Sequence, residues 1–312
     1  MTIRPDAPEN RPASADAAVI VRQARRLRFR VRRGAVTDLV GAYLGARPGT
    51  GLAFSELRAY EPGDDVRHID WNVTARQGRP YVRRFVEERA LTLQLVVDVS
   101  ASLRFGPEGR SKADRAMQAA ALLATAAIQN GDRAGLILVS DRVEAELAPA
   151  GGPRHLARLV RTLIVAPATS RRTALAVGLG RLRRRSRRAL VVVLSDFLDA
   201  ADEPVTAWSR ASRRNDVIAC RIIEPREEAL PEGAGLVRLI DAELSTVRTV
   251  DAGSRRVRAA YARAAEGRRA AFRRLCGAAG LSPLELSTTD DPISPLTRFF
   301  ADRGRPAGGS RR

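Results

Sequence analysis

The chain has 312 residues, 45% of them hydrophobic and 29% charged, so it can bury a core and is not disordered throughout. Its formal net charge of +19 would ordinarily indicate a nucleic acid or an acidic membrane as partner. Lys112, however, is the sole lysine among 54 cationic residues. This bias indicates that arginine fills ordinary solvated positions, and aromatic residues are nearly absent from the basic clusters Arg22–Arg33 and Arg181–Arg188. We therefore expect no nucleic acid partner.

The chain divides into four parts. Residues 1–17 are typical of a disordered lead and lack the apolar core of a signal peptide. Residues 18–90 form an irregular accessory segment, residues 91–302 the main domain, and residues 303–312 a disordered tail. No apolar run reaches the roughly 18–20 residues of a membrane-spanning helix. Only two cysteines are present and they lie far apart, which fits a reducing compartment, so we expect a cytoplasmic protein without a membrane span.

In the main domain, largely apolar runs alternate with helical patterns. Expected buried strands are Leu91–Val97, Ala134–Ser140, Ala189–Leu194 and Asp216–Ile223. Such alternation predicts an α/β fold with a doubly wound, mostly parallel sheet of the Rossmann type.

Two further features concern the edges of this sheet. Val143–Leu147 follows the preceding strand too closely for a crossover helix, so it is predicted to hairpin back as one antiparallel edge strand. Late in the chain, Leu236–Ile240, Arg255–Cys276 and Leu284–Leu286 are predicted to add strand, helix and strand and to extend the sheet nearly to the end.

Polar residues leave the carboxyl ends of these strands, where doubly wound sheets bind ligands. A D-x-S-x-S loop follows the first strand, a threonine stands where a later loop enters a helix, and an aspartate follows the third strand. Two carboxylates and three hydroxyls suit a hard divalent ion, Mg²⁺ or Mn²⁺, with one position left for an acidic side chain of a protein ligand. The predicted metal ligands are Asp98, Ser100, Ser102, Thr173 and Asp196.

This ligand pattern resembles the metal-ion-dependent adhesion site of von Willebrand factor A-type domains. Upstream, the strings FSELRAY, PGDDVRHIDW and YVRRFVEER resemble the bacterial "domain of unknown function 58" family, and the likeness extends from about residue 26 to residue 300. Relatives are typically encoded beside MoxR-type AAA+ ATPases. The resemblance implies a von Willebrand factor A-like fold and a non-enzymatic module that acts with such an ATPase in chaperone-like assembly or metal insertion. It also implies a short form without the N-terminal membrane helices of many relatives.

The string PGDDVRHIDW allows two interpretations. Its aspartates and arginine could pair within a turn while Trp71 anchors the accessory segment to the main domain, which is the interpretation we favour over an acid/base pair of His68 and Asp70. It could also form part of a partner surface, made by Asp64, Asp65, Arg67, Asp70 and Trp71.

Two alternative functions remain open. A metal-assisted hydrolase would use Asp98 or Asp196, but no histidine or glutamate stands nearby in the sequence as a base. A basic nucleic-acid-binding protein would use the arginine clusters. Lys112 follows a glycine-containing loop that lacks the spacing of a phosphate-binding loop, so we expect it to be a surface residue in the first turn of a helix and expect no ATP hydrolysis by this chain.

Overall fold

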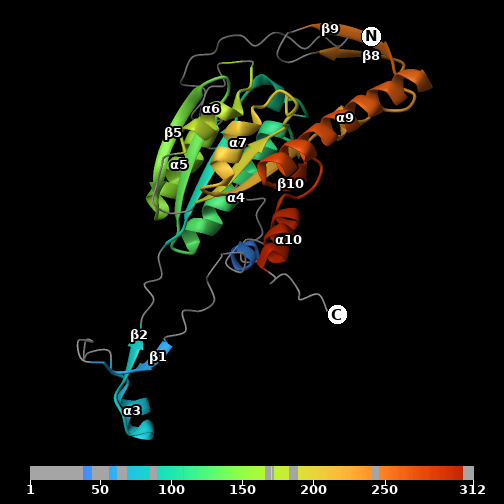
Figure 1. Cartoon of the computed structure of the whole chain (residues 1–312). Helices are drawn as coiled ribbons and strands as arrows, with labels where there is room; N and C mark the ends of the chain where they lie inside the picture. Colours follow the sequence, from blue (N-terminus) through green and yellow to red (C-terminus); the bar gives the residue numbers. More distant parts are fainter. Residues whose placement is uncertain are drawn as a thin grey trace, which may run out of the picture.

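The structure is a computed structural model that describes residues 38–43, 56–61, 69–84, 90–107, 109–165, 170, 172–182, 189–240 and 246–304. At its centre lies a six-stranded sheet of order β10-β7-β6-β3-β4-β5 (Figure 1). Its strands, in chain order, are β3 (Thr92–Asp98), β4 (Arg133–Val139), β5 (Val143–Ala150), β6 (Leu190–Ser195), β7 (Asp216–Ile223) and β10 (Ser282–Ser287).

The strand order confirms the doubly wound fold class. The chain enters the middle of the sheet at β3, moves outward through β4 to β5, returns to β6 beside β3, and moves the other way through β7 to β10. All neighbours are parallel except β4 and β5, so the predicted antiparallel edge strand is confirmed. The order reverses between β3 and β6, and ligands bind at such a point in doubly wound sheets.

Helices cover both faces of the sheet (Figure 1). The residues of β3 alternate between the faces, with Leu95 and Val97 in one core and Val96 in the other. The first core is covered by α4 (Lys112–Gln129), α5 (Pro153–Val165) and α10 (Ile293–Gly304). The second is covered by α6 (Leu175–Gly180), α7 (Val205–Ser212) and α9 (Arg255–Ala279).

The start of α4 is fixed by a capping box. The hydroxyl of Ser111 accepts the backbone N–H of Asp114 at 3.1 Å, and the carboxylate of Asp114 accepts the backbone N–H of Ser111 at 2.9 Å. Such reciprocal bonds satisfy two backbone donors that a helix leaves without a partner. Lys112 is thereby held at the first helical position.

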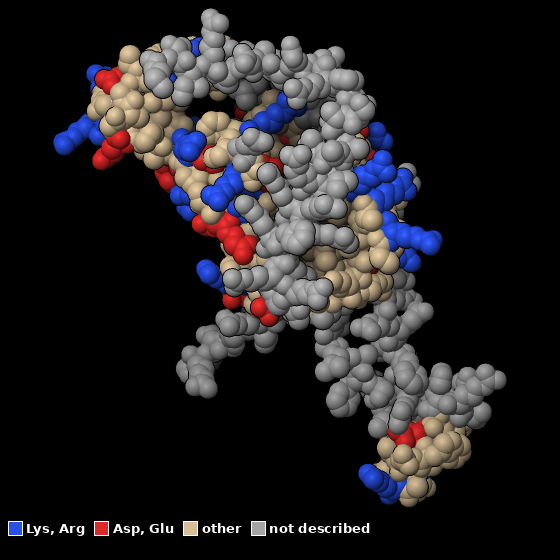
Figure 2. Space-filling model, turned by 180° about the vertical axis from the view of Figure 1, so that it is seen from behind, with Lys and Arg blue, Asp and Glu red and all other residues tan. Residues whose placement is uncertain are grey.

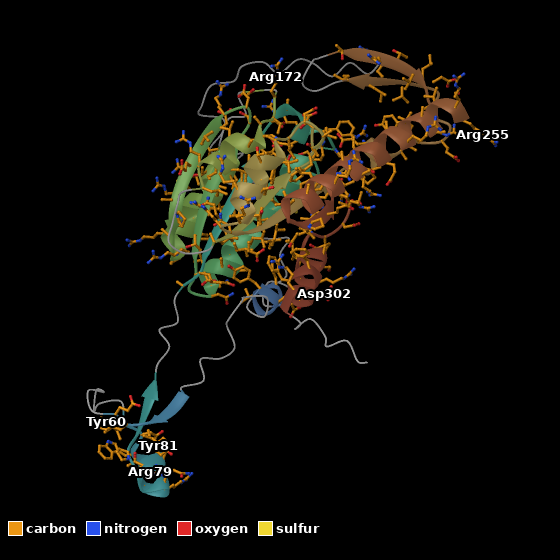
Figure 3. All side chains as sticks on the ribbon, in the orientation of Figure 1. Tyr60, Arg79, Tyr81, Arg172, Arg255 and Asp302 are labelled. Carbon is orange, nitrogen blue, oxygen red and sulfur yellow. The ribbon has the colours of Figure 1, made fainter. Side chains whose placement is uncertain are left out.

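The prediction for Leu236–Ile240 is partly wrong. These residues do form a strand, β8, but it pairs with β9 (Val247–Asp251) in an antiparallel hairpin and does not join the central sheet. Leu236 is 75% exposed and Ile240 66% exposed, whereas the inner strands of the central sheet are buried on both faces. The sequence pattern of a strand does not state its partner, which explains the error. Figure 3 shows Arg255, the first residue of α9, beside this hairpin and away from the sheet.

A second small sheet lies in the accessory segment. Strands β1 (Glu56–Ala59) and β2 (Tyr81–Arg84) pair antiparallel, and α3 (Trp71–Gln77) stands between them in the chain. Figure 3 shows Tyr60 and Tyr81 together in this unit, which Figure 1 places apart from the central sheet. Trp71 is 69% exposed, so the expectation that it anchors the segment to the main domain is wrong. Trp71 is the first residue of a short helix, and none of the residues of this helix is buried.

Another part of the accessory segment does contribute to the main core. Residues 38–43 are helical, and Leu39 and Tyr43 are buried in the first core. The ring of Tyr43 meets that of Phe300 edge-on at a centroid distance of 5.6 Å, a favourable aromatic geometry. This segment therefore packs with α10 although it lies far from it in the sequence.

We predict that Leu39→Ala lowers the free energy of unfolding of the α/β domain by about 2–5 kcal/mol, because it opens a cavity in a closed core. Leu236→Ala is the matched control and should change stability by no more than about 0.5 kcal/mol, because its side chain is already largely in water. Urea unfolding followed by circular dichroism measures both. Equal effects of the two variants would contradict the assignment of residues 38–43 to the core.

Candidate metal site

Asp98 ends β3 at the point where the strand order reverses, and only 1% of it is exposed. Its Oδ1 accepts the backbone N–H of Ser100 at 2.8 Å. Its Oδ2 accepts the hydroxyl of Ser195, the last residue of the neighbouring strand β6, at 2.6 Å. The carboxylate is therefore held in place from both strands that flank the switch point.

The two serines of the D-x-S-x-S loop lie beside this carboxylate. Ser100 is fully buried and stands at the N-cap position of the short 3-10 helix η2 (Ala101–Arg104), two residues after the end of β3. The hydroxyl oxygens of Ser100 and Ser102 lie 3.1 Å apart. Because both are neutral and buried, they could act as oxygen ligands without adding charge to the site.

Asp196 follows β6 and is 2% exposed. Its Oδ2 accepts the ammonium of Lys112 at 2.6 Å, and its Oδ1 accepts the backbone N–H of Leu198 at 3.3 Å. The next residue, Phe197, has a φ of 52°, in the left-handed region that residues with a side chain rarely adopt. Its ring packs against Trp208 and Phe272, so the core of the second face holds the turn that presents Asp196.

Thr173 lies in the loop that leads into α6 and is partly buried. The backbone N–H of the next residue, Ala174, donates to the carbonyl of Ser140 at 2.8 Å. Ser140 directly follows β4, the other parallel neighbour of β3. The Thr173 loop is thus attached to the carboxyl end of the sheet, the end where Asp98 and Asp196 also lie. Figure 3 labels the preceding residue, Arg172, at this end.

The expectation for Lys112 is wrong, because the residue is fully buried. Its ammonium donates to Asp196 and to both carboxylate oxygens of Glu227, at 2.7 and 2.9 Å. Glu227 belongs to the short helix α8 (Pro225–Glu228), which follows β7. Position N1 of α4 faces the switch point, so a side chain that would be solvated on another helix is enclosed here.

Sequence reasoning missed two members of the site, Ser195 and Glu227. Ser195 directly precedes Asp196 and could have been noticed as a polar residue ending an apolar strand. Glu227 carried no such signal, because it stands among other acidic residues after a proline. The isolated lysine in a chain that otherwise uses arginine was the available hint of a third carboxylate.

Burial and mutual repulsion dominate the electrostatics. Burial, together with the neighbouring charge of Asp196, raises the pKa of Asp98 to about 7. The hydrogen bonds from Ser195 and Ser100 act in the opposite direction but do not cancel this rise. Burial also raises the pKa of Glu227 despite the attraction of Lys112. For Lys112, burial would lower the pKa, but Asp196 and Glu227 outweigh it and raise the pKa.

The residues present fit a hard divalent ion. Among the described residues, no lysine or arginine forms an ion pair with Asp98. The single charge of Lys112 is shared by Asp196 and Glu227. Two buried carboxylates that repel each other are costly without a further cation. Within the described part of the chain no three His, Cys, Asp or Glu side chains gather as metal ligands, so an ion here would depend on hydroxyl and water oxygens.

The second predicted surface is only partly described. Asp64, Asp65 and Arg67 lie outside the described residues, as does the cluster Arg22–Arg33. Asp70 is the N-cap of α3, where its Oδ1 accepts the backbone N–H groups of Asn72 and Val73 at 3.0 and 3.2 Å. This cap gives Asp70 a structural role. The exposed Trp71 beside it is available for contact with another molecule.

Fold and site together define an α/β protein with a candidate cation site at the switch point of its sheet. The family model described as "Protein of unknown function DUF58" matches residues 56–271, and the chain belongs to this family. The uncharacterized protein Rv1480 of Mycobacterium tuberculosis is 37% identical over 278 residues, covering 86% of this chain and 85% of that protein. The uncharacterized protein MAV169 of Mycobacterium avium is 35% identical over 169 residues, covering 51% of this chain and 95% of that protein.

Two solved structures show weaker likeness. The conserved hypothetical protein BatB of Bacteroides thetaiotaomicron aligns with a TM-score of 0.45 and 12% identity, over 69% of this chain and 98% of its own. The SpRpn10 VWA domain aligns with a TM-score of 0.35 and 10% identity, over 67% of this chain and 94% of its own. At these scores the fold class rests on the strand order itself. Among the helices of the described residues, none is long and apolar enough to cross a membrane.

We predict that Asp98→Asn raises the melting temperature of the metal-free protein at neutral and higher pH. Because the folded-state pKa of Asp98 is raised to about 7 from its ordinary value of 3.8, ionisation destabilises the fold progressively as pH rises between these values. The gain should therefore be largest above about pH 7 and vanish toward about pH 4. Thermal melts in EDTA across this range measure it.

The matched control is Glu232→Gln, which removes a carboxylate whose side chain is 90% exposed. It should give no pH-dependent gain. A gain of Asp98→Asn that is independent of pH, or largest in acid, would contradict the proposed cost of the buried charge.

Proposed function

We propose that this chain is a protein-interaction module whose contact with its partner depends on a divalent ion, Mg²⁺ or Mn²⁺. The ligands in this proposal are the five residues predicted from the sequence, Asp98, Ser100, Ser102, Thr173 and Asp196. The observation that supports it best is the pair of buried carboxylates, Asp98 and Asp196, at the switch point, with two buried hydroxyls beside Asp98. A bound divalent ion would relieve their mutual repulsion.

The choice of ligands suits docking better than catalysis. Neutral hydroxyls complete the oxygen set without cancelling the charge of the ion, so the ion supplies an electrophilic position for a carboxylate of another protein. Asp98 is held by Ser100 and Ser195, and Asp196 by Lys112, so both carboxylates are oriented before anything binds. Such preorganisation lowers the entropic cost of association.

We propose further that the chain is not an enzyme. A metal-assisted hydrolase needs a base that can take a proton from water. His155, the one histidine within the described residues, contacts the carbonyl of Ala134 at the opposite end of β4. The carboxylates of Asp98, Asp196 and Glu227 all already accept hydrogen bonds within the protein.

The partner in this proposal is a MoxR-type AAA+ ATPase, with chaperone-like assembly or metal insertion as the shared task. Membership of the DUF58 family supports this choice through the association described above. A nucleic acid is not proposed. Among the described residues on the face shown in Figure 2, the basic side chains lie in separate groups with acidic ones among them, which is unlike the continuous stripe that tracks a phosphate backbone.

We predict that Mg²⁺ or Mn²⁺ raises the melting temperature of the protein by roughly 5–10 °C at a concentration a hundred times the dissociation constant. Asp98→Ala should abolish the shift because it removes a direct ligand. Ser140→Ala is the matched control: its hydroxyl lies at the same edge but donates to Glu144 at 2.6 Å, so the shift should persist. A wild-type melting temperature that does not respond to either ion would refute metal dependence.

We predict that the immobilised protein retains a MoxR-type ATPase in the presence of Mg²⁺ and releases it in EDTA. Asp98→Ala should fail to retain the ATPase, and Ser140→Ala should behave as wild type. Pull-down with the purified ATPase, quantified on gels, measures this. Retention that is equal with and without EDTA would show that the contact does not pass through the ion.

A further inference from the structure

Lys112 is chemically unusual in this chain. It is the one lysine among 54 cationic residues, and it is also fully buried, whereas most arginines of the described residues are not buried. A composition that replaces lysine by arginine almost everywhere retains lysine at the one position that contacts the candidate metal site.

The geometry around Lys112 suits an ammonium better than a guanidinium. Three oxygens converge on its Nζ: one from Asp196 at 2.6 Å and two from Glu227 at 2.7 and 2.9 Å. An ammonium is a compact point charge that can meet three convergent acceptors. The planar fork of arginine would spread its donors over a wider space, and this pocket is closed on all sides of the lysine.

Glu227 is held in place independently of Lys112. Arg268 on α9 donates to the backbone carbonyl of Glu227 at 2.8 Å, and the hydroxyl of Tyr261 donates to the carbonyl of Arg226 at 3.1 Å. Helix α8 is thus hydrogen-bonded to α9, and the carboxylate of Glu227 offers two oxygens to the ammonium of Lys112. Asp196 contributes only one oxygen to Lys112 and belongs to the proposed metal ligands. Lys112 could therefore release Asp196 and keep Glu227.

We propose that Lys112 competes with the divalent ion for Asp196, so that it sets the ion affinity of the site, with Glu227 holding the ammonium when the ion binds. This inference rests on the proposed metal site. Two positive charges cannot share one buried carboxylate oxygen without strong repulsion, so each weakens the binding of the other. The free protein consequently binds the ion less tightly than its oxygen ligands alone would allow.

The test compares Mn²⁺ affinity between the wild type and the double variant Lys112→Met/Glu227→Gln, by electron paramagnetic resonance of the free ion. The two substitutions cancel in net charge, while the competitor of Asp196 is removed. We expect Mn²⁺ to bind at least about tenfold more tightly, the value of one charge-assisted hydrogen bond. Circular dichroism and melting in EDTA establish that the variant is folded.

The matched control is Arg221→Met/Glu228→Gln. It removes the ion pair between Arg221 of β7 and Glu228 of α8, with a nitrogen to oxygen distance of 2.8 Å, which does not involve Asp196. This variant should bind Mn²⁺ as the wild type does. A similar gain in both double variants, or no gain in Lys112→Met/Glu227→Gln while the wild type binds Mn²⁺, would overturn the competition and leave the metal site standing. Absence of Mn²⁺ binding in all three proteins would overturn both proposals.

A second measurement needs no substitution. Because the chain has one lysine, protein labelled with lysine carrying ¹⁵N at Nζ and ¹³C at Cε gives one side-chain signal, which belongs to Lys112. Adding Mg²⁺ should shift this signal, because the ammonium loses Asp196. A melting temperature that rises with Mg²⁺ while the lysine signal stays in place would exclude the competition and retain the metal site.

Discussion

The geometry of the candidate site follows from one feature of the sheet: β3 lies between β4 and β6 as a parallel neighbour of both. The carboxyl ends of these three strands therefore meet at one edge. Asp98 ends β3, and Asp196 follows β6. The Thr173 loop is hydrogen-bonded to Ser140, which follows β4. Residues that are far apart in the sequence are brought together by strand order alone, and the loops only refine their positions.

Burial gives this edge its chemical character. An aspartate in water is ionised and needs no partner. Asp98, in contrast, is enclosed by the strand ends and is repelled by the charge of Asp196. The cores of the two sheet faces maintain this enclosure, since Phe197 and its aromatic neighbours hold the turn of Asp196 on one side. Hydrophobic packing thus creates the electrostatic cost that a cation would relieve. Stability and the proposed function are opposed at this point.

Much of the fold was predictable because its strands are buried on both faces. Continuous Val, Leu and Ile runs such as those of β6 and β7 have few alternative interpretations, and the short connection before β5 required an antiparallel hairpin. The pairing of β8 with β9 and the entry of Leu39 into the core were not predictable in the same way. Both depend on contacts between segments whose own patterns do not name a partner.

The candidate site was predictable to the extent that its residues directly follow strands. The positions of Asp98 and Asp196 follow from the end of an apolar run and from the rule for switch points. The burial of Lys112 depends on where the first turn of α4 points, and its pairing with Glu227 depends on the packing of α8 against α9. Tertiary packing of this kind leaves no local trace, apart from the solitary use of lysine.

Anomalous diffraction from crystals of the protein soaked in Mn²⁺ tests directly whether the ion binds at this edge of the sheet. The proposed metal site requires one strong peak within ligand distance of the side-chain oxygens of Asp98, Ser100, Ser102, Thr173 and Asp196. A protein that remains free of anomalous density at this edge, or that binds Mn²⁺ only elsewhere on its surface, would contradict it.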